Sequence, residues 1–220
     1  MKIAIIGASG KTGTKLLVEA LDRHHEVVAV CRKPSVEKLH DLADSHQVTV
    51  VSAPIVSDQE MLTRALAGCH AVLAVPISAG RLKATDLVRS LSAASLDNGV
   101  NRFVFTAGEV TTGLAADETH TLRQHLMLPF YTFITWFTPY SLTDMRRATD
   151  LIRQQDSWVW TIIRAPTLTD SSPEGYAFCD ISDVTINHTL SRSDYASCLL
   201  DSLDNPDHFQ STLTVISAKQ

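Results

Sequence analysis

Short apolar runs alternate with amphipathic stretches along most of the chain. Residues Lys2 to Ile6 form a β-branched run that stops at a glycine, which is typical of a buried parallel strand. Residues 11–23 then place leucine and alanine at helical spacing. The pattern therefore predicts a strand, a glycine turn and a helix, in that order.

The same unit recurs through the first half and returns, less regularly, in the second half. Further strands are predicted at residues 26–31, 48–51, 71–75, 102–106, 158–164 and 212–216, and helices at 35–44, 59–67, 85–97, 142–154 and 194–203. A loop is predicted at 108–117. Strands that alternate with helices over short connections predict an α/β, Rossmann-type doubly wound parallel sheet. We expect a single domain over residues 1–220, with a small substrate-side C-terminal portion.

The amino-acid composition says less about the fold than about the possible functions. The chain has 220 residues, 45% of them hydrophobic, and a formal net charge of -5. This balance argues against a nucleic-acid or anionic-membrane surface and favours a small-molecule substrate. The four cysteines have no metal-ligand spacing, and we expect buried thiols and no metal. No signal-peptide core or membrane span is found, so we expect a cytoplasmic protein.

The stretch from Gly7 to Gly13 has the form G-x-x-G-x-x-G between the first predicted strand and helix. Gly7 allows a sharp turn, Gly10 lets the backbone approach a diphosphate, and Gly13 lets the helix pack on the sheet. Amides at the helix N-terminus can bind the diphosphate, and Ser9, Lys11 and Thr12 can add side-chain donors. Alternatively, the turn only connects a strand to a helix. Its position in a serial βαβ pattern favours dinucleotide binding.

The second predicted strand ends in Arg32 and Lys33 rather than in an acidic residue. An acid there would bind the ribose 2′-hydroxyl of NAD, whereas an arginine can bind the 2′-phosphate of NADP. We therefore expect NADP (NADPH) as the cofactor. The alternative is a pair of solvated surface cations at a strand end.

Four segments give the sequence a resemblance to a known family. They are the glycine loop, residues 102–106 (RFVFT), residues 160–166 (WTIIRAP) and residues 191–196 (SRSDYA). Together they resemble the atypical short-chain dehydrogenases of the NmrA-like type, which include flavin reductase/biliverdin-IXβ reductase-like proteins. The resemblance extends from residue 1 to about 216.

The resemblance implies further cofactor contacts after three strands. Ala74, Val75 and Pro76 would border the adenosine side and the diphosphate; Thr106, Ala107 and Gly108 would lie beside the nicotinamide; Pro166, Thr167 and Leu168 would pack at the nicotinamide end. Two departures stand out. Ala53-Pro54 replaces a Gly-Asp pair that often touches adenine, and Ala165 is inserted into the usual Arg-Pro pair.

The Tyr-x-x-x-Lys pair of conventional short-chain dehydrogenases is absent from the sequence. A flavin or quinone can take up hydride without such a tyrosine, because the product anion is delocalised and water can supply the proton. No zinc-binding or nucleophile motif is present, and His120 and His125 are not spaced to share a helix face.

Two functions follow from these patterns. The first is an NADPH-dependent reductase of a flavin, quinone or similar conjugated acceptor, with Thr106 as the candidate catalytic residue. The second is a non-catalytic, NADP-sensing regulatory protein. The aromatic-rich residues 128–137 form a substrate-pocket wall, a homodimer face or an ordinary core helix, and the pattern leaves these alternatives open.

Overall fold

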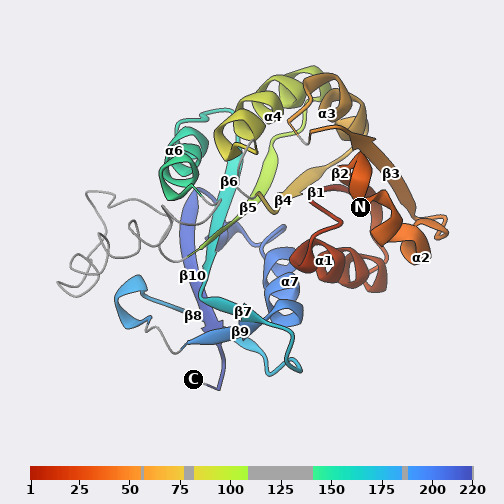
Figure 1. Cartoon of the computed structure of the whole chain (residues 1–220). Coiled ribbons are helices and arrows are strands. Elements are labelled where there is room, and N and C mark those ends of the chain that lie inside the picture. The colour runs from red at the N-terminus through yellow and green to blue at the C-terminus, as the bar shows by residue number, and fades with distance from the viewer. Residues whose placement is uncertain (56, 77–81, 109–140, 185–187, 220) are drawn as a thin grey trace.

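The computed structural model describes residues 1–55, 57–76, 82–108, 141–184 and 188–219, and its centre is a large twisted sheet (Figure 1). The strands are β1 (Lys2–Ile6), β2 (Glu26–Arg32), β3 (Val48–Ala53), β4 (Ala71–Ala74), β5 (Arg102–Gly108), β6 (Val159–Ala165), β8 (Tyr176–Cys179) and β10 (Ser211–Ser217). Their order is β3-β2-β1-β4-β5-β6-β10-β8, and the recorded pairings are parallel except for that of β8 with β10. This order begins with the 3-2-1-4-5-6 arrangement of doubly wound dinucleotide folds.

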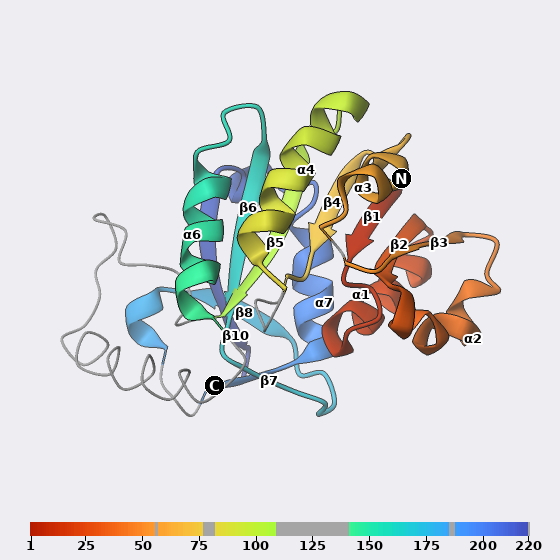
Figure 2. The same cartoon turned by 45° about the horizontal axis from the view of Figure 1, so that its top comes forward.

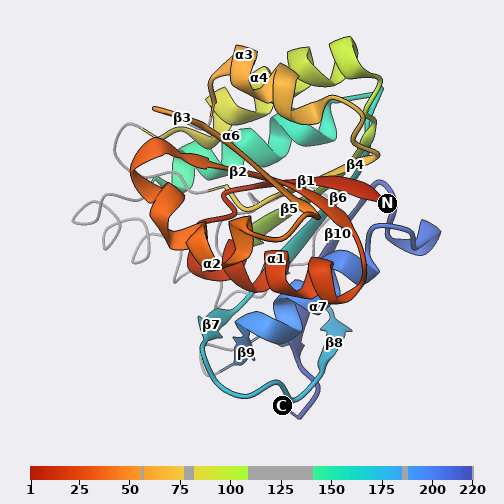
Figure 3. The same cartoon turned by 90° about the vertical axis from the view of Figure 1, so that its right-hand side faces the viewer.

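Helices cover both faces of the sheet. They are α1 (Lys11–Asp22), α2 (His40–Ala43), α3 (Gln59–Leu66), α4 (Ala84–Asn98), α6 (Leu142–Arg153) and α7 (Arg192–Asp201), with 3-10 turns η1 (Lys33–Leu39), η2 (Ile181–Asp183) and η3 (Pro206–His208). Helices α3, α4 and α6 lie on one face and α1, α2 and α7 on the other (Figure 3). Helix α4 packs against α6 (Figure 2) and α1 packs against α7.

Alternation along β1 shows how the sequence divides between the two layers. Ile3 and Ile5 pack in the core under α1 and α7, whereas Ala4 and Ile6 pack in the core under α3, α4 and α6. All four side chains are buried, as expected for a parallel strand with helices on both faces. The predicted α/β, Rossmann-type parallel sheet is therefore confirmed.

The predicted helices and strands agree with the structure in type and place, with two kinds of correction; the loop predicted at 108–117 lies outside the described residues from residue 109 on. Residues 35–44 form a 3-10 turn followed by a four-residue helix, because Pro34 starts the segment and the connection is short. Strand β5 continues to Gly108, which pairs with Ala165, so Thr106 to Gly108 belong to the strand rather than follow it.

Three short strands of the second half have no counterpart in the sequence prediction. Strands β7 (Thr167–Thr169) and β9 (Thr189–Ser191) form a separate parallel pair, and β8 adds to the edge of the main sheet. Strands this short carry too few alternating positions to be seen as a pattern. Thr167 and Leu168 therefore lie in a strand, and β9 leads directly into α7.

Candidate functional site

The turn after β1 lies between the ends of the neighbouring strands β2 and β4. Gly7 has a positive φ of 86°, and its amide and that of Ala8 both donate to the carbonyl of Val30 on β2, at 2.9 and 3.1 Å. A Cβ on Gly7 would lie 2.9 Å from the carbonyl oxygen of Val75, which follows β4. Only glycine satisfies both the backbone angle and this close approach.

The other two glycines of the loop differ in how much space surrounds them. A Cβ on Gly13 would lie 2.1 Å from the Gly7 carbonyl oxygen, so the first turn of α1 is packed against its own loop. A Cβ on Gly10 would meet only the Gly7 oxygen within 4 Å, at 3.2 Å. Gly13 is therefore required by the fold, whereas Gly10 faces open space that a ligand can enter.

The N-terminus of α1 lacks the caps found on the other long helices. Gly10 supplies no side-chain cap, and the first turn contains no acidic residue. By contrast, a side-chain oxygen accepts a hydrogen bond from a backbone amide at the start of each of the other long helices. The donor amide, acceptor side chain and distance are Met61, Asp58 and 2.8 Å for α3; Ala84, Asp144 and 2.7 Å for α4; Asp144, Ser141 and 3.3 Å for α6; and Asp194, Ser191 and 2.9 Å for α7. The unpartnered amides and the helix dipole make the start of α1 a site for an anion.

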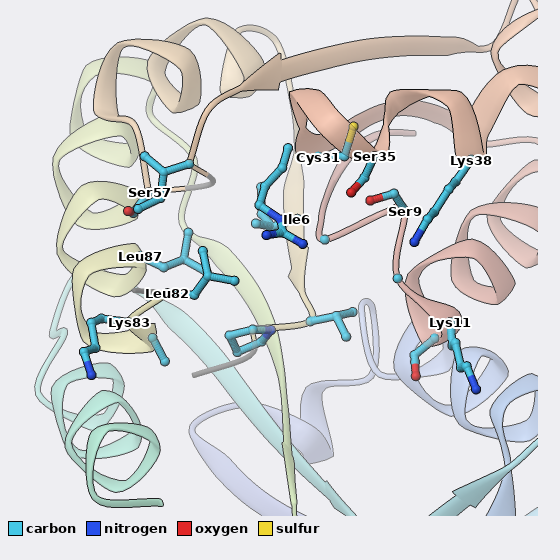
Figure 4. Close-up of a pocket in the computed structure, with 18 of the residues that line it drawn as sticks. Ile6, Ser9, Lys11, Cys31, Ser35, Lys38, Ser57, Leu82, Lys83 and Leu87 are labelled. Carbon is cyan, nitrogen blue, oxygen red and sulfur yellow. The ribbon is translucent and has the colours of Figure 1, made fainter. Parts of the chain in front are cut away.

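A cleft of about 470 Å³ opens at this helix start, at the carboxyl ends of β1, β2 and β4. Figure 4 shows side chains from the glycine loop, η1 and the start of α4 around it. Its described lining residues are Ile6, Gly7, Ser9, Gly10, Lys11, Thr12, Cys31, Arg32, Ser35, Lys38, Ile55, Ser57, Val75, Pro76, Leu82, Lys83, Ala84, Leu87 and Arg192. The cleft thus brings together the loop and strand-end residues predicted from the sequence.

The cleft is basic in a chain whose net charge is -5. Lys11, Arg32, Lys38, Lys83 and Arg192 line it, and its described lining contains no aspartate or glutamate. Among the described residues, the side-chain nitrogens of the first four have no recorded hydrogen-bond or ion-pair partner; Arg192 pairs with Asp170. Cations held together without carboxylates predict a ligand with several negative charges.

Within the segment after β2, the structure separates the two predicted cations. Arg32 ends the strand and lines the cleft, whereas Lys33 begins η1, is exposed and is not among the lining residues. Ser35 and Lys38 line the cleft instead, and Lys38 extends from η1 toward the glycine loop beside Ser9 (Figure 4). The positive charge at this end of the cleft therefore comes from Arg32 and Lys38.

The predicted residues on β4, β5 and β6 reach the cleft unequally. Val75 and Pro76 line it, whereas Ala74 is buried in β4. Ala107, Gly108, Pro166, Thr167 and Leu168 lie at or just beyond the ends of β5 and β6 and are not among its described lining. The substitution of Ala53-Pro54 for the family pair places a buried methyl group at the end of β3, and Ala165 ends β6 as a regular strand residue.

Thr106, the candidate catalytic residue, is buried in β5 and is not among the described cleft residues. Its side chain interacts with the phenol of Tyr195 on α7, which donates to the carbonyl of Ile163 at 2.6 Å. Burial raises the pKa of Tyr195 well above its ordinary value. These contacts hold α7 against β5 and β6, and neither Thr106 nor Tyr195 is among the described cleft residues.

The described chain gives no sign of a metal site or a redox-active cysteine pair. No group of three or more His, Cys, Asp or Glu side chains able to hold a metal occurs in it, and all four cysteines are free. Burial raises the pKa of Cys31, the one thiol of the described cleft lining. Within the same residues, no helix is long and apolar enough to cross a membrane. His120, His125 and residues 128–137 lie outside the described residues.

A glycine loop, an uncapped helix start and a basic cleft at the switch point define a dinucleotide-binding Rossmann protein. Residues 7–206 match the family described as NAD(P)H-binding, and the chain belongs to that family. The resemblance to atypical short-chain dehydrogenases predicted from the sequence is confirmed at this level.

Relatives extend over nearly the whole chain. The uncharacterized protein YwnB of Bacillus subtilis is 28% identical over 224 residues, which cover 99% of each chain. The oxidoreductase tpcG of Aspergillus fumigatus is 26% identical over 215 residues, which cover 94% of this chain and 80% of tpcG.

Solved structures share the fold at lower identity. A short-chain dehydrogenase/reductase of Veillonella parvula in complex with NADP has a TM-score of 0.76 and 19% identity, over 97% of this chain and 93% of that one. ChuY, an anaerobillin reductase of Escherichia coli O157:H7, has a TM-score of 0.76 and 17% identity, over 100% and 98%. At these identities the likeness concerns the fold alone.

Proposed function

We propose that this protein is an NADPH-dependent reductase that transfers hydride to a flavin, a quinone or a similar conjugated acceptor. The observation that carries the proposal is the cleft in which cations without recorded partners surround the uncapped start of α1. An NADP(H) molecule has a diphosphate and a 2′-phosphate, which together carry about four negative charges. Two similar proteins, the oxidoreductase tpcG and the anaerobillin reductase ChuY, agree with this class of reaction.

Each part of the cleft has a role in the proposed binding mode. The amides at the start of α1, with Ser9, Lys11 and Thr12, bind the diphosphate at the open side of Gly10. Arg32 and Lys38 bind the 2′-phosphate, because a guanidinium and an ammonium can both donate to the same anion. Val75 and Pro76 border the adenosine side, and Ala107, Gly108 and Pro166 to Leu168 form the nicotinamide end.

The chemistry requires orientation more than a proton donor. When bound, a reduced nicotinamide supplies a hydride to the acceptor ring, and solvent supplies the proton. The hydroxyls of Tyr176 and Tyr195 donate to Asp201 and to the Ile163 carbonyl, both at 2.6 Å, and burial raises the pKa of both phenols. Neither of these tyrosines is placed to protonate a substrate. Thr106 then acts by positioning the end of β5.

The experiment follows NADPH absorbance while the purified protein is offered a panel of flavins and quinones. We expect oxidation above the background rate with at least one acceptor, and a lower KM for NADPH than for NADH. Tight NADPH binding without oxidation of any acceptor would contradict the reductase proposal.

A second candidate is a regulatory protein that binds NADP without turning it over. The cations without recorded partners around the uncapped start of α1 support it equally, because they can bind the dinucleotide whether or not hydride is transferred, and the buried Thr106 adds no reacting group to the described cleft. The same experiment separates the two functions. For the regulator, NADPH and NADP⁺ would bind, and one of them would change the oligomeric state or the protease sensitivity of the protein.

A further inference from the structure

Arg192 is a cation of the cleft that the proposed cofactor contacts do not use. It is the first residue of α7 and lines the cleft together with the start of α1, against which α7 packs. Among the described lining residues, it alone comes from the second half of the chain. Its side chain has 16% of its surface exposed, so the guanidinium is largely held in place.

One carboxylate orients this guanidinium. Arg192 Nη1 donates to Asp170 Oδ1 at 2.8 Å. The pair lies one residue beyond the end of the small β7·β9 sheet, where Thr169 is in register with Ser191. No other partner of Arg192 is recorded in the described part of the chain, so its remaining donors are available to a planar anion.

Apart from the ion pair with Asp170, the start of α7 does not favour a cation at this position. A positive charge in the first turn of a helix opposes the helix dipole, and Ser191 and Asp194 already cap α7 through the 2.9 Å bond from the Asp194 amide. A charge placed against the dipole and facing a cleft is better explained by a ligand than by stability.

The topology puts Arg192 at the opposite end of the sheet edge from Arg32. Arg32 ends β2, whereas Arg192 follows β9, which pairs with the continuation of β6. Strands β1, β4 and β5 lie between β2 and β6. At about 4.8 Å per strand, β2 and β6 are about 19 Å apart across the sheet. The partner of Arg192, Asp170, follows directly after β7, so Arg192 lies on the side of the cleft where the proposed binding mode puts the nicotinamide.

We infer that Arg192 binds an anionic group of the acceptor, so that the substrate class is a conjugated ring carrying a carboxylate or a phosphate. This inference rests on the proposed reductase function, because that function defines what the acceptor is. The binding of the anionic group can nevertheless be tested without turnover. Asp170 is a positioning residue in this arrangement, because it fixes the guanidinium plane through Nη1.

The test measures ligand binding to the full chain saturated with NADP⁺, which cannot donate hydride. Four flavins with the same ring serve as probes: FMN against riboflavin for a phosphate, and 10-carboxymethylflavin against lumiflavin for a carboxylate. We expect the anionic member of at least one pair to bind about 10- to 100-fold more tightly, as for a hydrogen bond to a charged group. The pair that shows the preference identifies the anion.

Three variants separate recognition from structure. Arg192→Gln should abolish the preference for the anionic flavin while leaving the affinities for the neutral flavin and NADP⁺ unchanged. Asp170→Asn breaks the same ion pair but keeps the cation in the cleft, and should retain a preference. Arg89→Gln removes an exposed arginine that pairs with Asp86 at 3.5 Å outside the cleft, and should change nothing.

Several results would overturn the inference. They are equal binding of the charged and neutral members in both pairs, no binding of either anionic flavin, equal loss of preference in Asp170→Asn, or a loss of NADP⁺ affinity in Arg192→Gln. If the anionic flavin binds as expected but NADPH does not reduce it, the reductase function fails and the Arg192 site stands.

Discussion

Tyr195 on α7 donates its phenol hydrogen to the carbonyl of Ile163 on β6 at 2.6 Å, and the same phenol interacts with the side chain of Thr106 on β5. It also interacts with the backbone of Ala107. One buried hydroxyl therefore joins α7 to two neighbouring strands where they approach the carboxyl edge of the sheet. This contact gives the buried Thr106 side chain a structural role that does not require it to react.

Replacing Thr106 with valine should affect stability more than chemistry. Valine keeps the shape but replaces a buried hydroxyl that interacts with the Tyr195 phenol, so we expect the free energy of unfolding to fall by about 1 to 3 kcal/mol. The rate of NADPH oxidation should fall less than tenfold, and urea denaturation with steady-state kinetics measures both quantities. A loss of more than a hundredfold in kcat with unchanged stability would instead make Thr106 catalytic, as the sequence analysis expected.

The glycine loop gives a prediction with opposite outcomes at two positions. Gly13→Ala would place a Cβ 2.1 Å from the Gly7 oxygen, so we expect a strongly destabilised protein with a lower melting temperature. Gly10→Ala meets only a 3.2 Å contact and should fold, but the methyl group enters the space of the diphosphate. NADPH titration of the folded Gly10→Ala protein should show at least a tenfold loss of affinity. Unchanged affinity would contradict the assignment of the loop to the phosphates.

The sequence predicted the parallel sheet and the loop because both depend on local patterns. Glycines at fixed spacing after a buried strand determine the turn, and helix periodicity determines which residues are buried. Lys38 was not predicted, since residues 35–44 were expected to form an ordinary helix. In the 3-10 turn, side chains three residues apart lie above one another, which places Lys38 with Ser35 at the cleft and Lys33 on another side.

Arg192 could not be predicted as a cleft residue for a different reason. Its position depends on the β7·β9 pairing, which joins segments about twenty residues apart through three-residue strands. Strands of this length have no detectable periodicity, and only tertiary packing brings α7 beside α1. The sequence motif around residues 191–196 indicated a family but not which of its side chains faces a ligand.

Stability should decline in mild acid because of His208. Its Nε2 lies 3.1 Å from the amide nitrogen of Asn205, whose oxygen accepts the Asp207 amide hydrogen, and its Nδ1 lies 2.9 Å from the hydroxyl of Ser202. Nε2 therefore acts as an acceptor in the neutral ring, and burial lowers the pKa of His208 below its ordinary 6.5. The unfolded chain then takes up a proton at a higher pH than the folded one, so stability is present above about pH 6.5 and falls as the pH drops through the folded pKa.

Chemical denaturation at several pH values measures this dependence. His208→Gln should reduce the slope of the free energy of unfolding against pH between neutral pH and mild acid. The reduction should correspond to a fraction of one proton. His25, whose pKa burial also lowers, stays in both proteins and gives the remaining slope. An unchanged slope in the variant would mean that His208 does not contribute.

The choice of dinucleotide depends on Arg32 and Lys38, and their removal should weaken NADPH selectively. A hydrogen bond to a charged group contributes about 1.5 to 3 kcal/mol, so Arg32→Ala should lower NADPH affinity by about one to two decades and hardly change NADH. Lys38→Ala should act in the same direction. Because Arg32 lies at an exposed strand end, both losses should shrink at high salt.

Lys33→Ala is the matched control for these two variants. It removes a neighbouring cation that is exposed and absent from the described cleft lining, so its NADPH affinity should stay within about threefold of the parent protein. Fluorescence titration with NADPH and NADH at low and high salt compares all three variants. An equal loss for both dinucleotides in Arg32→Ala would mean that this arginine supports the glycine loop, and a preference of the parent protein for NADH would exclude the 2′-phosphate site. A large loss of NADPH affinity in Lys33→Ala would show that Lys33 contributes to phosphate binding. Positive charge alone, and not the position on η1, would then determine which cations bind the phosphate.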